Sequence, residues 1–399
     1  MPAFPILSFS RKPILLIIFI IVFVFLYHIA SHPKVSKSMQ SVAYYNNYDE
    51  RACLPQRLLE KSPPTKKAKA AMVILVRNRE QQAIAETLAN FQDKFNKNFN
   101  YPYVFLNEQP FTEDFKRAMK EAAPQAEMKF GLVPEKHWSY PAWVDPNLAA
   151  EARIKMDQKG VLYGGLESYH HMCRYQSGFF FDHPLLDEYE WYWRVEPGVK
   201  YFCDITYDPF LYMEKHKKKY GFVVTLLELR DTIPSLWKTV EEYAKSRRID
   251  ISNNSNLLFP YFRNSETGDF NLCHFWSNFE IASLNFWRSP EYRDFFHYLD
   301  QTGNFFYERW GDAPVHSLAA GLFLKTDEIH YFQDFGYQHD LYRHCPTKES
   351  GLRCRCECPE GTNEKSIDHD TYYDTCLPVW LQHVKKEEER KKANWSVWS

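Results

Sequence analysis

The segment Tyr189-Glu-Trp-Tyr-Trp-Arg-Val-Glu-Pro-Gly-Val-Lys-Tyr-Phe-Cys203 decides the fold. An apolar and aromatic run ends in the carboxylate of Glu196, and Pro197 then stops regular strand pairing. This pattern is typical of a buried strand that presents an acid at its carboxyl end, where open α/β sheets bind ligands. Such an acid, with Asp204 further along, suits a divalent cation and the phosphates it carries. The alternative is a solvated glutamate at a turn.

The chain before this segment alternates short apolar runs with helical periods. Residues 71–76 and 103–106 are continuous apolar runs, which predict buried parallel strands. Residues 81–95 and 111–123 predict helices between and after them. This β-α-β-α opening favours an α/β fold with a largely parallel sheet.

The rest of the chain continues the alternation less regularly. We expect strands at 221–225 and 329–332, a mainly irregular stretch at 248–268, and helices at 207–219, 234–247, 290–299 and 314–324.

Composition limits the class of protein. The chain has 399 residues, enough for one large domain or two modest ones, and its aromatic content is 17%. The formal net charge of −2 gives no basic surplus, so a nucleic acid partner is not expected.

The N-terminal region predicts a membrane anchor. Residues 13–30 contain no Asp, Glu, Lys or Arg, and as a helix they would span about 27 Å, close to the thickness of a hydrocarbon core. Arg11 and Lys12 precede the run, which favours a cytoplasmic tail at 1–12, a signal anchor at 13–30 and a luminal stem at 31–69. A signal peptide is disfavoured because no small-residue cleavage site stands out, and a core helix because the run is apolar on all faces.

The cysteines point to an oxidising compartment. There are nine, so at least one lacks an intramolecular partner. Five lie between Cys345 and Cys376, where a zinc ribbon is the alternative to a disulfide-stapled loop. The loop is favoured because the C-x-C-x-C spacing lacks the usual C-x-x-C knuckle. A charged tail at 381–399 follows the expected large domain at 70–380, as a solvated helix or a disordered end.

The block Phe270-Asn-Leu-Cys-His-Phe-Trp-Ser-Asn-Phe-Glu-Ile-Ala282 is long and unusual in composition. It resembles the signature of the fungal Golgi α-1,2-mannosyltransferases, the glycolipid 2-alpha-mannosyltransferase family (glycosyltransferase family 15). Four other blocks agree in order: Cys173-Arg-Tyr-Gln-Ser-Gly-Phe-Phe180, Tyr192-Trp-Arg-Val-Glu-Pro197, Trp310-Gly-Asp-Ala-Pro-Val-His316 and Gly336-Tyr-Gln-His339. The resemblance covers roughly residues 70–376. It implies a nucleotide-diphospho-sugar transferase (GT-A-like) fold, in which helices flank a central mixed sheet within a single large domain.

The resemblance also implies a donor, a cofactor and the residues that hold them. The donor is GDP-mannose and the cofactor is Mn²⁺, with Glu196 and His339 as metal ligands. Glu280 matches the family's candidate nucleophile, and Tyr169 matches a tyrosine at the donor sugar. Gly198 departs from the pattern, because the family often has Asp at this position.

Four further residues are assigned to the donor. By resemblance, Arg79 and, less directly, Arg77 bind the nucleotide, with a surface arginine as the alternative for each. Arg194 faces the same side of the strand as Glu196, so it either pairs with that acid or binds the diphosphate. Asp312 either binds sugar hydroxyls or caps the following helix. His274 and His316 are interpreted as core histidines.

The predicted function is a retaining mannosyltransferase that adds mannose to the 2-hydroxyl of a mannose acceptor. The acceptor is a mannosylated glycoprotein with O-linked glycans, and N-linked glycans are a further class. The expected location is the Golgi (or ER) membrane, as a single-pass type II protein with a luminal catalytic domain. The alternatives are a non-catalytic mannan-binding or scaffolding member and the same fold with another donor, such as UDP-galactose or GDP-fucose. Retention allows either a nucleophilic Glu280 or a same-face attack.

Overall fold

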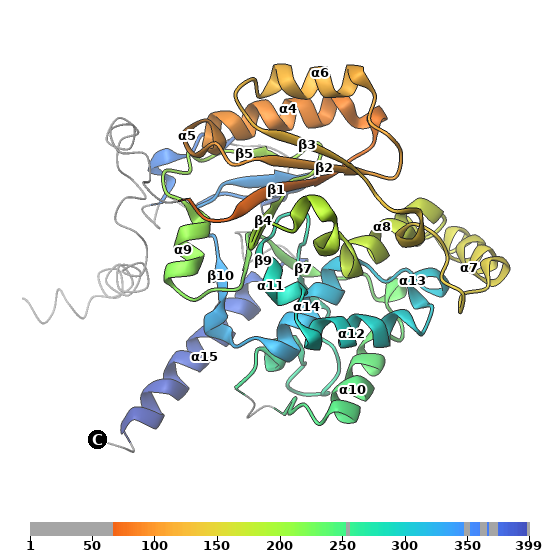
Figure 1. Ribbon diagram of the computed structural model, residues 1–399. Helices are drawn as coiled ribbons and strands as arrows, with labels where there is room; N and C mark the ends of the chain where they lie inside the picture. The colour runs from red at the N-terminus through yellow and green to blue at the C-terminus, as the bar shows by residue number, and fades with distance from the viewer. Residues whose placement is uncertain (1–66, 253–255, 347–351, 360–364, 367–373, 397–399) are drawn as a thin grey trace, which may run out of the picture. The chain divides into compact units, whose positions relative to one another are not determined.

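The computed structural model describes residues 67–252, 256–346, 352–359, 365–366 and 374–396 (Figure 1). The predicted cytoplasmic tail, signal anchor and most of the stem lie outside these residues. Within the described part of the chain, no helix is long and apolar enough to cross a membrane.

A seven-stranded mixed sheet forms the centre of the described domain. Its strand order is β10 (Ile329–Tyr331), β6 (Tyr220–Phe222), β9 (Ile281–Ser283), β4 (Trp191–Arg194), β1 (Ala70–Leu75), β2 (Tyr103–Asn107) and β3 (Met128–Leu132). Neighbouring strands are parallel except at β9, which runs antiparallel to both β4 and β6. The prediction of a mixed α/β sheet is therefore confirmed. Because β9 is reversed, its first residue lies at the edge of the sheet where β4 ends.

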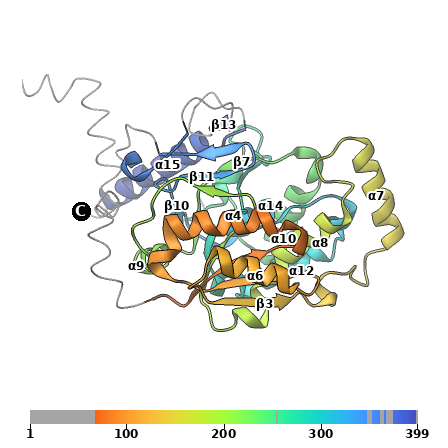
Figure 2. The ribbon, with the colours of Figure 1, turned by 90° about the horizontal axis from the view of Figure 1, so that it is seen from above.

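Helices cover both faces of this sheet (Figures 1 and 2). Helices α4 (Gln81–Phe91) and α6 (Glu113–Ala122) pack side by side on one face, in a core that includes Met72 and Trp193. The other face carries α8 (Glu167–Gly178), α12 (Pro290–Asp300) and α14 (Asp312–Phe323). Alternate residues of β1 and β4 enter the two cores, as the two-residue period of a strand requires.

Local sequence signals set several helix starts. The Thr112 hydroxyl accepts a hydrogen bond from the Phe115 amide at the start of α6. The Ser289 hydroxyl caps α12 in the same way, and Pro290 occupies the first turn.

A smaller sheet extends from the carboxyl end of β4. It consists of β13 (Lys365–Ser366), β12 (Tyr342–His344), β11 (Tyr337–His339) and β5 (Lys200–Tyr201), in that order. Antiparallel pairing of β11 with β5 joins Tyr337 to Tyr201. This pairing brings His339 next to the turn that follows Glu196.

The single strand predicted at 221–225 is wrong in detail. The chain forms β6 in the central sheet and then leaves it, and β7 (Thr225–Leu227) pairs instead with β8 (Cys273–Phe275). Val223 and Val224 are buried at the bend, so an unbroken apolar run spans two strands that belong to different sheets.

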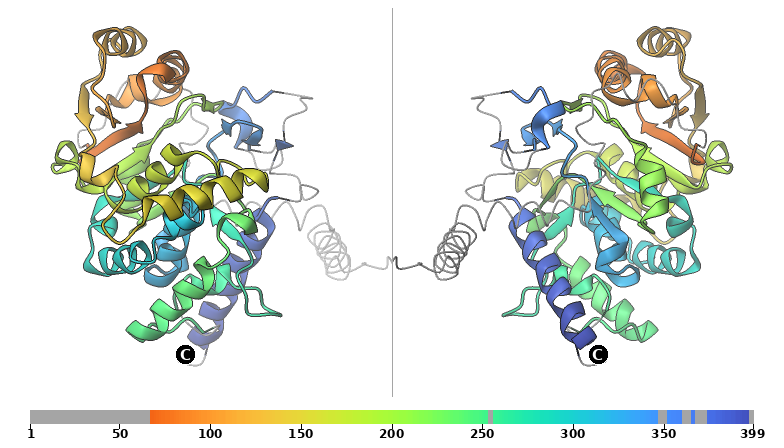
Figure 3. Two further views of the ribbon diagram at one scale, coloured as in Figure 1. Left: turned by 90° about the vertical axis from the view of Figure 1, so that its right-hand side faces the viewer. Right: turned by 90° about the vertical axis from the view of Figure 1, so that its left-hand side faces the viewer.

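The remaining helices of the described residues include the two expected at 207–219 and 234–247 and several that the sequence did not predict. They are α5 (Lys97–Phe99), α7 (Pro146–Gln158), α9 (Pro209–Lys215), α10 (Leu236–Arg247), α11 (Leu284–Trp287), α13 (Asn304–Tyr307) and α15 (Leu377–Ser396). The pattern did not predict the helices α5, α7, α8, α11 and α13, or the strand β3 and the short strands β5, β8, β9, β11, β12 and β13. The irregular stretch contains a short 3-10 helix, Phe259–Phe262. The expected charged tail continues α15 up to Ser396, and this helix points away from the sheet (Figure 3).

Disulfides replace the zinc alternative among the described cysteines. Cys203 pairs with Cys356, Cys273 with Cys376 and Cys345 with Cys358. Cys354 is also disulfide-bonded, whereas Cys173 is a free, buried thiol, as the odd count requires.

Buried histidines make the stability of this fold dependent on pH. Burial lowers the pKa of His171 to about 4 and also lowers the pKa of His274 and His330. The unfolded chain, with histidine pKa near 6.5, binds more protons than the folded chain below that pH. We expect the free energy of unfolding to fall from about pH 6.5 toward pH 4, by up to about 1.4 kcal/mol per pH unit for each such histidine.

Urea unfolding at a series of pH values measures this dependence. The variant His171→Phe should show a shallower decline over the same range, because one of the titrating groups has been removed. An unchanged decline would contradict the assignment.

Candidate active site

The carboxyl edge of the central sheet collects the charged residues singled out in the sequence. Glu196 follows β4, and Glu280 directly precedes the reversed strand β9. Asp312 begins α14, and His339 ends β11. The Arg194 amide donates to the Glu280 carbonyl at 2.9 Å, which ties the end of β4 to the start of β9. Four segments distant in sequence thus meet at one edge.

Arg194 is the centre of this arrangement. Its guanidinium donates to Glu196 Oε1, with Nε at 2.8 Å, and also to the carboxylate of Asp312. Burial alone would lower the pKa of Arg194, which is only 5% exposed, but Glu196 and Asp312 outweigh burial and raise the pKa. The predicted pairing of Arg194 with Glu196 is present.

Asp312 is an ion-pair partner rather than a helix cap. Gly311 occupies the N-cap position of α14, which has no side-chain cap. The Asp312 carboxylate accepts from Arg194 and, at 2.7 Å, from the Ser277 hydroxyl. Burial raises the pKa of Asp312, but Arg194 more than offsets this effect, so the group stays ionised. Its predicted contact with sugar hydroxyls stays a prediction.

Glu196 and His339 form a pair that could hold a cation. Their Oε2 and Nε2 atoms lie 3.6 Å apart, and both side chains are partly exposed, by 23% and 20%. Arg194 engages Oε1 of Glu196, which leaves Oε2 facing the imidazole. One carboxylate oxygen and one imidazole nitrogen suit Mn²⁺, so these residues fit the expected metal.

The other ligands of such an ion would come from the substrate or water. Among the described residues, the only group of three or more acids, histidines and cysteines close enough to share a metal is Cys203, Cys356 and Cys358, whose sulfurs are in disulfides. Asp204, the second acid noted in the sequence, pairs with Lys94 at 3.3 Å. The diphosphate of a nucleotide sugar would supply the oxygens that the protein lacks.

Glu280 is held inside the core beneath this edge. Its side chain is buried, and Oε1 accepts from the Tyr192 hydroxyl at 2.6 Å. The indole of Trp287 donates to the same tyrosine oxygen at 3.0 Å, so the tyrosine proton is directed to Glu280. Oε2 lies 3.1 Å from Nδ1 of His316.

The contacts of His316 allow its protons to be counted. Its Nε2 lies 3.1 Å from the carbonyl oxygen of Gln176, which can only accept, so Nε2 carries a proton. The contact between Nδ1 and Glu280 then needs one further proton, held by either partner. Glu280 and His316 therefore share one proton in a site closed to solvent. A nucleophilic role for Glu280 would require one of its two oxygens to become accessible to the sugar from this buried position, and that role stays a prediction.

Tyr169 lies at the start of α8. Its ring stacks on Tyr163 at 4.7 Å between centroids, and the Arg309 guanidinium lies 5.4 Å from its ring centroid. Burial raises its pKa well above 10, so the phenol is neutral and can donate a hydrogen bond. Arg309 itself pairs with Glu228 at 3.3 Å.

The two arginines after β1 differ in availability. Nε of Arg77 donates to Glu108, just beyond β2, at 2.7 Å. Arg79 is exposed, and its guanidinium makes no hydrogen bond or ion pair with any residue that the structure describes. Arg79 is therefore the freer of the two to bind an anion.

His316 was interpreted from the sequence as a core histidine, and it is buried and hydrogen-bonded as expected. The sequence did not reveal that its partner is Glu280. One signal was present: His316 follows Asp312 by one helical turn, so both project from the same face of α14.

The glycolipid 2-alpha-mannosyltransferase family model matches residues 28–384. The chain belongs to this family. The predicted family and a mannosyltransferase enzyme are thereby confirmed.

Individual relatives agree with this assignment. The glycolipid 2-alpha-mannosyltransferase of Saccharomyces cerevisiae is 52% identical over 327 residues, which cover 81% of this chain and 73% of that protein. The O-glycoside alpha-1,2-mannosyltransferase omh1 of Schizosaccharomyces pombe is 42% identical over 336 residues, covering 84% and 83%. The crystal structure of core-mannan synthase A from Aspergillus fumigatus, in a Mn/GDP form, superposes with a TM-score of 0.73 at 35% identity, covering 82% of this chain and 88% of that one.

The buried ion pair can be tested by removing one partner. In Asp312→Ala, Arg194 keeps its buried charge but loses a carboxylate, which should lower the free energy of unfolding by about 3–5 kcal/mol. The matched control is Asp114→Ala, which breaks the exposed pair between Asp114 and Arg117 on α6 and should cost less than about 1 kcal/mol. If urea unfolding showed equal losses of unfolding free energy in Asp312→Ala and Asp114→Ala, the central role of Arg194 would be contradicted.

Proposed function

We propose that this protein is a retaining α-1,2-mannosyltransferase that uses GDP-mannose and Mn²⁺ and acts in the Golgi. The observation that carries the proposal is the pair Glu196–His339, fixed beside Arg194 at the carboxyl edge of the sheet in a member of this family. The name of the Saccharomyces cerevisiae relative supports transfer to the 2-position of mannose, and the Mn/GDP form of core-mannan synthase A supports the donor and the metal.

Four of the charged residues at this edge have a task in that reaction. A bound Mn²⁺ neutralises the diphosphate, which makes GDP a good leaving group. Glu196 and His339 would hold the ion, and Arg194 orients Glu196 so that Oε2 remains available. Arg79 offers a free positive charge to the nucleotide.

The surroundings of Tyr169 and Glu280 favour a same-face attack over a covalent step. Tyr169 is a neutral phenol that can donate to the departing phosphate oxygen or to a sugar hydroxyl. A covalent step would need the buried carboxylate of Glu280, which contacts Tyr192 and His316, to become accessible to the sugar, whereas a same-face attack needs no such movement.

The relatives support the proposed acceptor, and the N-terminal sequence supports the proposed location. The O-glycoside alpha-1,2-mannosyltransferase of Schizosaccharomyces pombe supports O-linked glycans as acceptors. The apolar run at 13–30 supports a type II anchor in the Golgi or ER membrane, with the enzyme in the lumen.

The departure at Gly198 does not favour the non-catalytic alternative. Gly198 has a φ of +81°, a left-handed conformation that suits glycine, and a Cβ there would touch nothing. The glycine therefore serves the turn after Glu196, and the contact between Glu196 and His339 is formed without an acid at this position.

Transfer by the full-length protein in detergent tests the function. With GDP-mannose, Mn²⁺ and methyl α-mannoside, we expect an α-1,2-linked disaccharide, identified by NMR, and loss of product with a chelator. Glu196→Ala and His339→Ala should each lower kcat by roughly 10²–10³-fold, the cost of losing one electrostatic contact in a transition state.

Asp204→Ala is the matched control. This acid lies on the same segment but pairs with Lys94, so its loss should leave transfer nearly unchanged. Undiminished transfer by Glu196→Ala, or product that survives the chelator, would refute the site. Transfer from another nucleotide sugar in place of GDP-mannose would refute the donor.

A further inference from the structure

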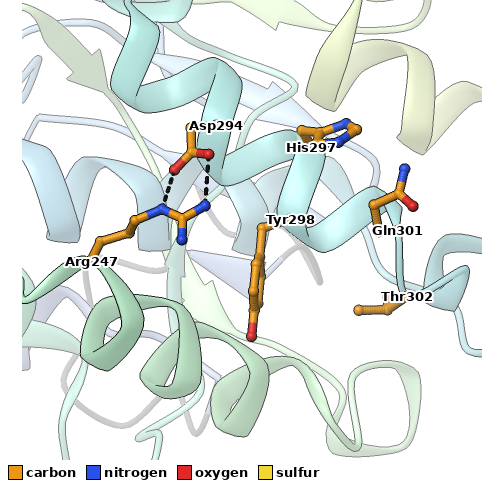
Figure 4. Close-up of a pocket in the computed structure, with 6 residues that line it drawn as sticks. All are labelled: Arg247, Asp294, His297, Tyr298, Gln301 and Thr302. Carbon is orange, nitrogen blue, oxygen red and sulfur yellow. Dashed lines mark hydrogen bonds and ion pairs between the residues drawn. The ribbon is translucent and has the colours of Figure 1, made fainter.

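Two cavities flank helix α12, away from the residues discussed so far. The larger, of about 520 Å³, lies between α12 and the C-terminal end of α8. The smaller, of about 300 Å³, lies between α12 and α10 (Figure 4). His297 lines both cavities, so they are adjacent along one helix. Both volumes are of the size that holds small ligands.

The larger cavity lies at the opposite edge of the sheet from Glu196. Phe181 lines this cavity, and Tyr189 lies just before β4. Arg288 donates hydrogen bonds to the carbonyl oxygens of both residues, so the two lie close together. The cavity is therefore close to the start of β4, whereas Glu196 follows its end. None of the predicted catalytic, donor or metal residues lines either cavity.

The same polar unit occurs three times around α12. Arg174 pairs with Asp300, Arg293 with Asp182, and Arg247 with Asp294, each through two hydrogen bonds to the two carboxylate oxygens. Each guanidinium also lies over an aromatic ring: the rings of Phe179, Phe181 and Tyr243, respectively. Rings and paired charges together fix the positions of these groups.

This pairing selects for a neutral ligand. Each guanidinium is already ion-paired with a carboxylate, so an anionic ligand would have to displace that carboxylate. Among the lining residues, only Lys136 adds a charge without an ion-pair partner. The outer N–H groups and carboxylate lone pairs still offer donors and acceptors side by side. Adjacent hydroxyls of a sugar, each of which both donates and accepts, match that arrangement.

Two aromatic rings complete the sites, of which Trp143 is exposed and Tyr298 is half-buried. Trp143 is 43% exposed at the larger cavity, and its indole N–H donates to the Asp300 carbonyl at 2.7 Å, which holds the ring in place. In the smaller cavity the Tyr298 ring points from α12 toward α10, beside the Arg247–Asp294 pair (Figure 4). Flat apolar faces next to fixed polar groups suit the C–H face and the hydroxyls of a pyranose ring.

We propose that the two cavities along α12 form a second carbohydrate-binding site, which holds mannose residues of the glycoprotein acceptor away from the transfer site. The choice of mannose as the sugar rests on the proposed function. The position at the opposite edge implies that only large acceptors can use both sites at once.

Binding to the full-length protein tests this site without any transfer. Calorimetry with an α-1,2-linked mannotriose, in the presence of GDP, should show binding that Trp143→Ala weakens about tenfold, as for loss of a ring at the centre of an interface. Arg293→Ala should weaken binding as well, and Trp143→Phe should retain most of it. Arg117→Ala, in an exposed ion pair on α6, is the matched control and should bind as the wild type does.

Steady-state kinetics gives an independent measurement. Trp143→Ala should raise KM for a mannosylated glycoprotein. With methyl α-mannoside as the acceptor, both kcat and KM should stay unchanged. Binding of mannotriose that neither Trp143→Ala nor Arg293→Ala weakens, in folded proteins, would overturn the proposal, as would equal binding of maltotriose. Binding of inorganic phosphate in place of the sugar would also overturn it. If the wild type transfers no mannose at all, the proposed function fails, and the calorimetric comparison still decides whether this site exists.

Discussion

The buried guanidinium of Arg194 is the interaction on which the rest of the site depends. A charge taken out of water is tolerated only when it is paired and hydrogen-bonded. Glu196 and Asp312 meet that requirement from two different segments, and Ser277 supports Asp312. The same contacts that stabilise Arg194 turn one oxygen of Glu196 toward His339. The structural requirement and the proposed metal site are thus met by one arrangement.

The reversed strand β9 adds a second constraint. In an all-parallel sheet, the residue preceding a strand would lie at the opposite edge from Glu196. Reversal of β9 places Glu280 at the same edge, beneath Arg194. There it shares a proton with His316 and accepts from Tyr192, in a core closed to water. This buried hydrogen-bond network holds the start of β9 in place beneath Arg194, under the proposed sugar-transfer site.

Much of the fold could be predicted from the sequence because strands that are buried on both faces consist of consecutive apolar residues. β1, β2 and β4 were found in this way, and the Glu196–Pro197 stop located the functional edge. The three-residue strand β9 carries too short a signal, and β11 becomes adjacent to Glu196 only by pairing with β5. Contacts made across such long separations leave no local pattern.

The candidate site was predicted to a similar extent. The pairing of Arg194 with Glu196 follows from strand alternation, since both residues face the same side. The link from Arg194 to Asp312 and the link from Glu280 to His316 depend on how α14 packs against the sheet, and no spacing in the sequence encodes that packing. The three Arg–Asp pairs around α12 could not be predicted either, because the two residues of each pair come from different segments of the chain.

The most direct test of this account is the position of the metal. A crystal of the protein grown with GDP and Mn²⁺, with data collected at the manganese absorption edge, would locate the ion by anomalous scattering. We expect a single strong peak coordinated by Oε2 of Glu196 and Nε2 of His339, with Oε1 of Glu196 still hydrogen-bonded to Arg194. A peak coordinated by other side chains, or GDP bound with manganese away from Glu196, would contradict it.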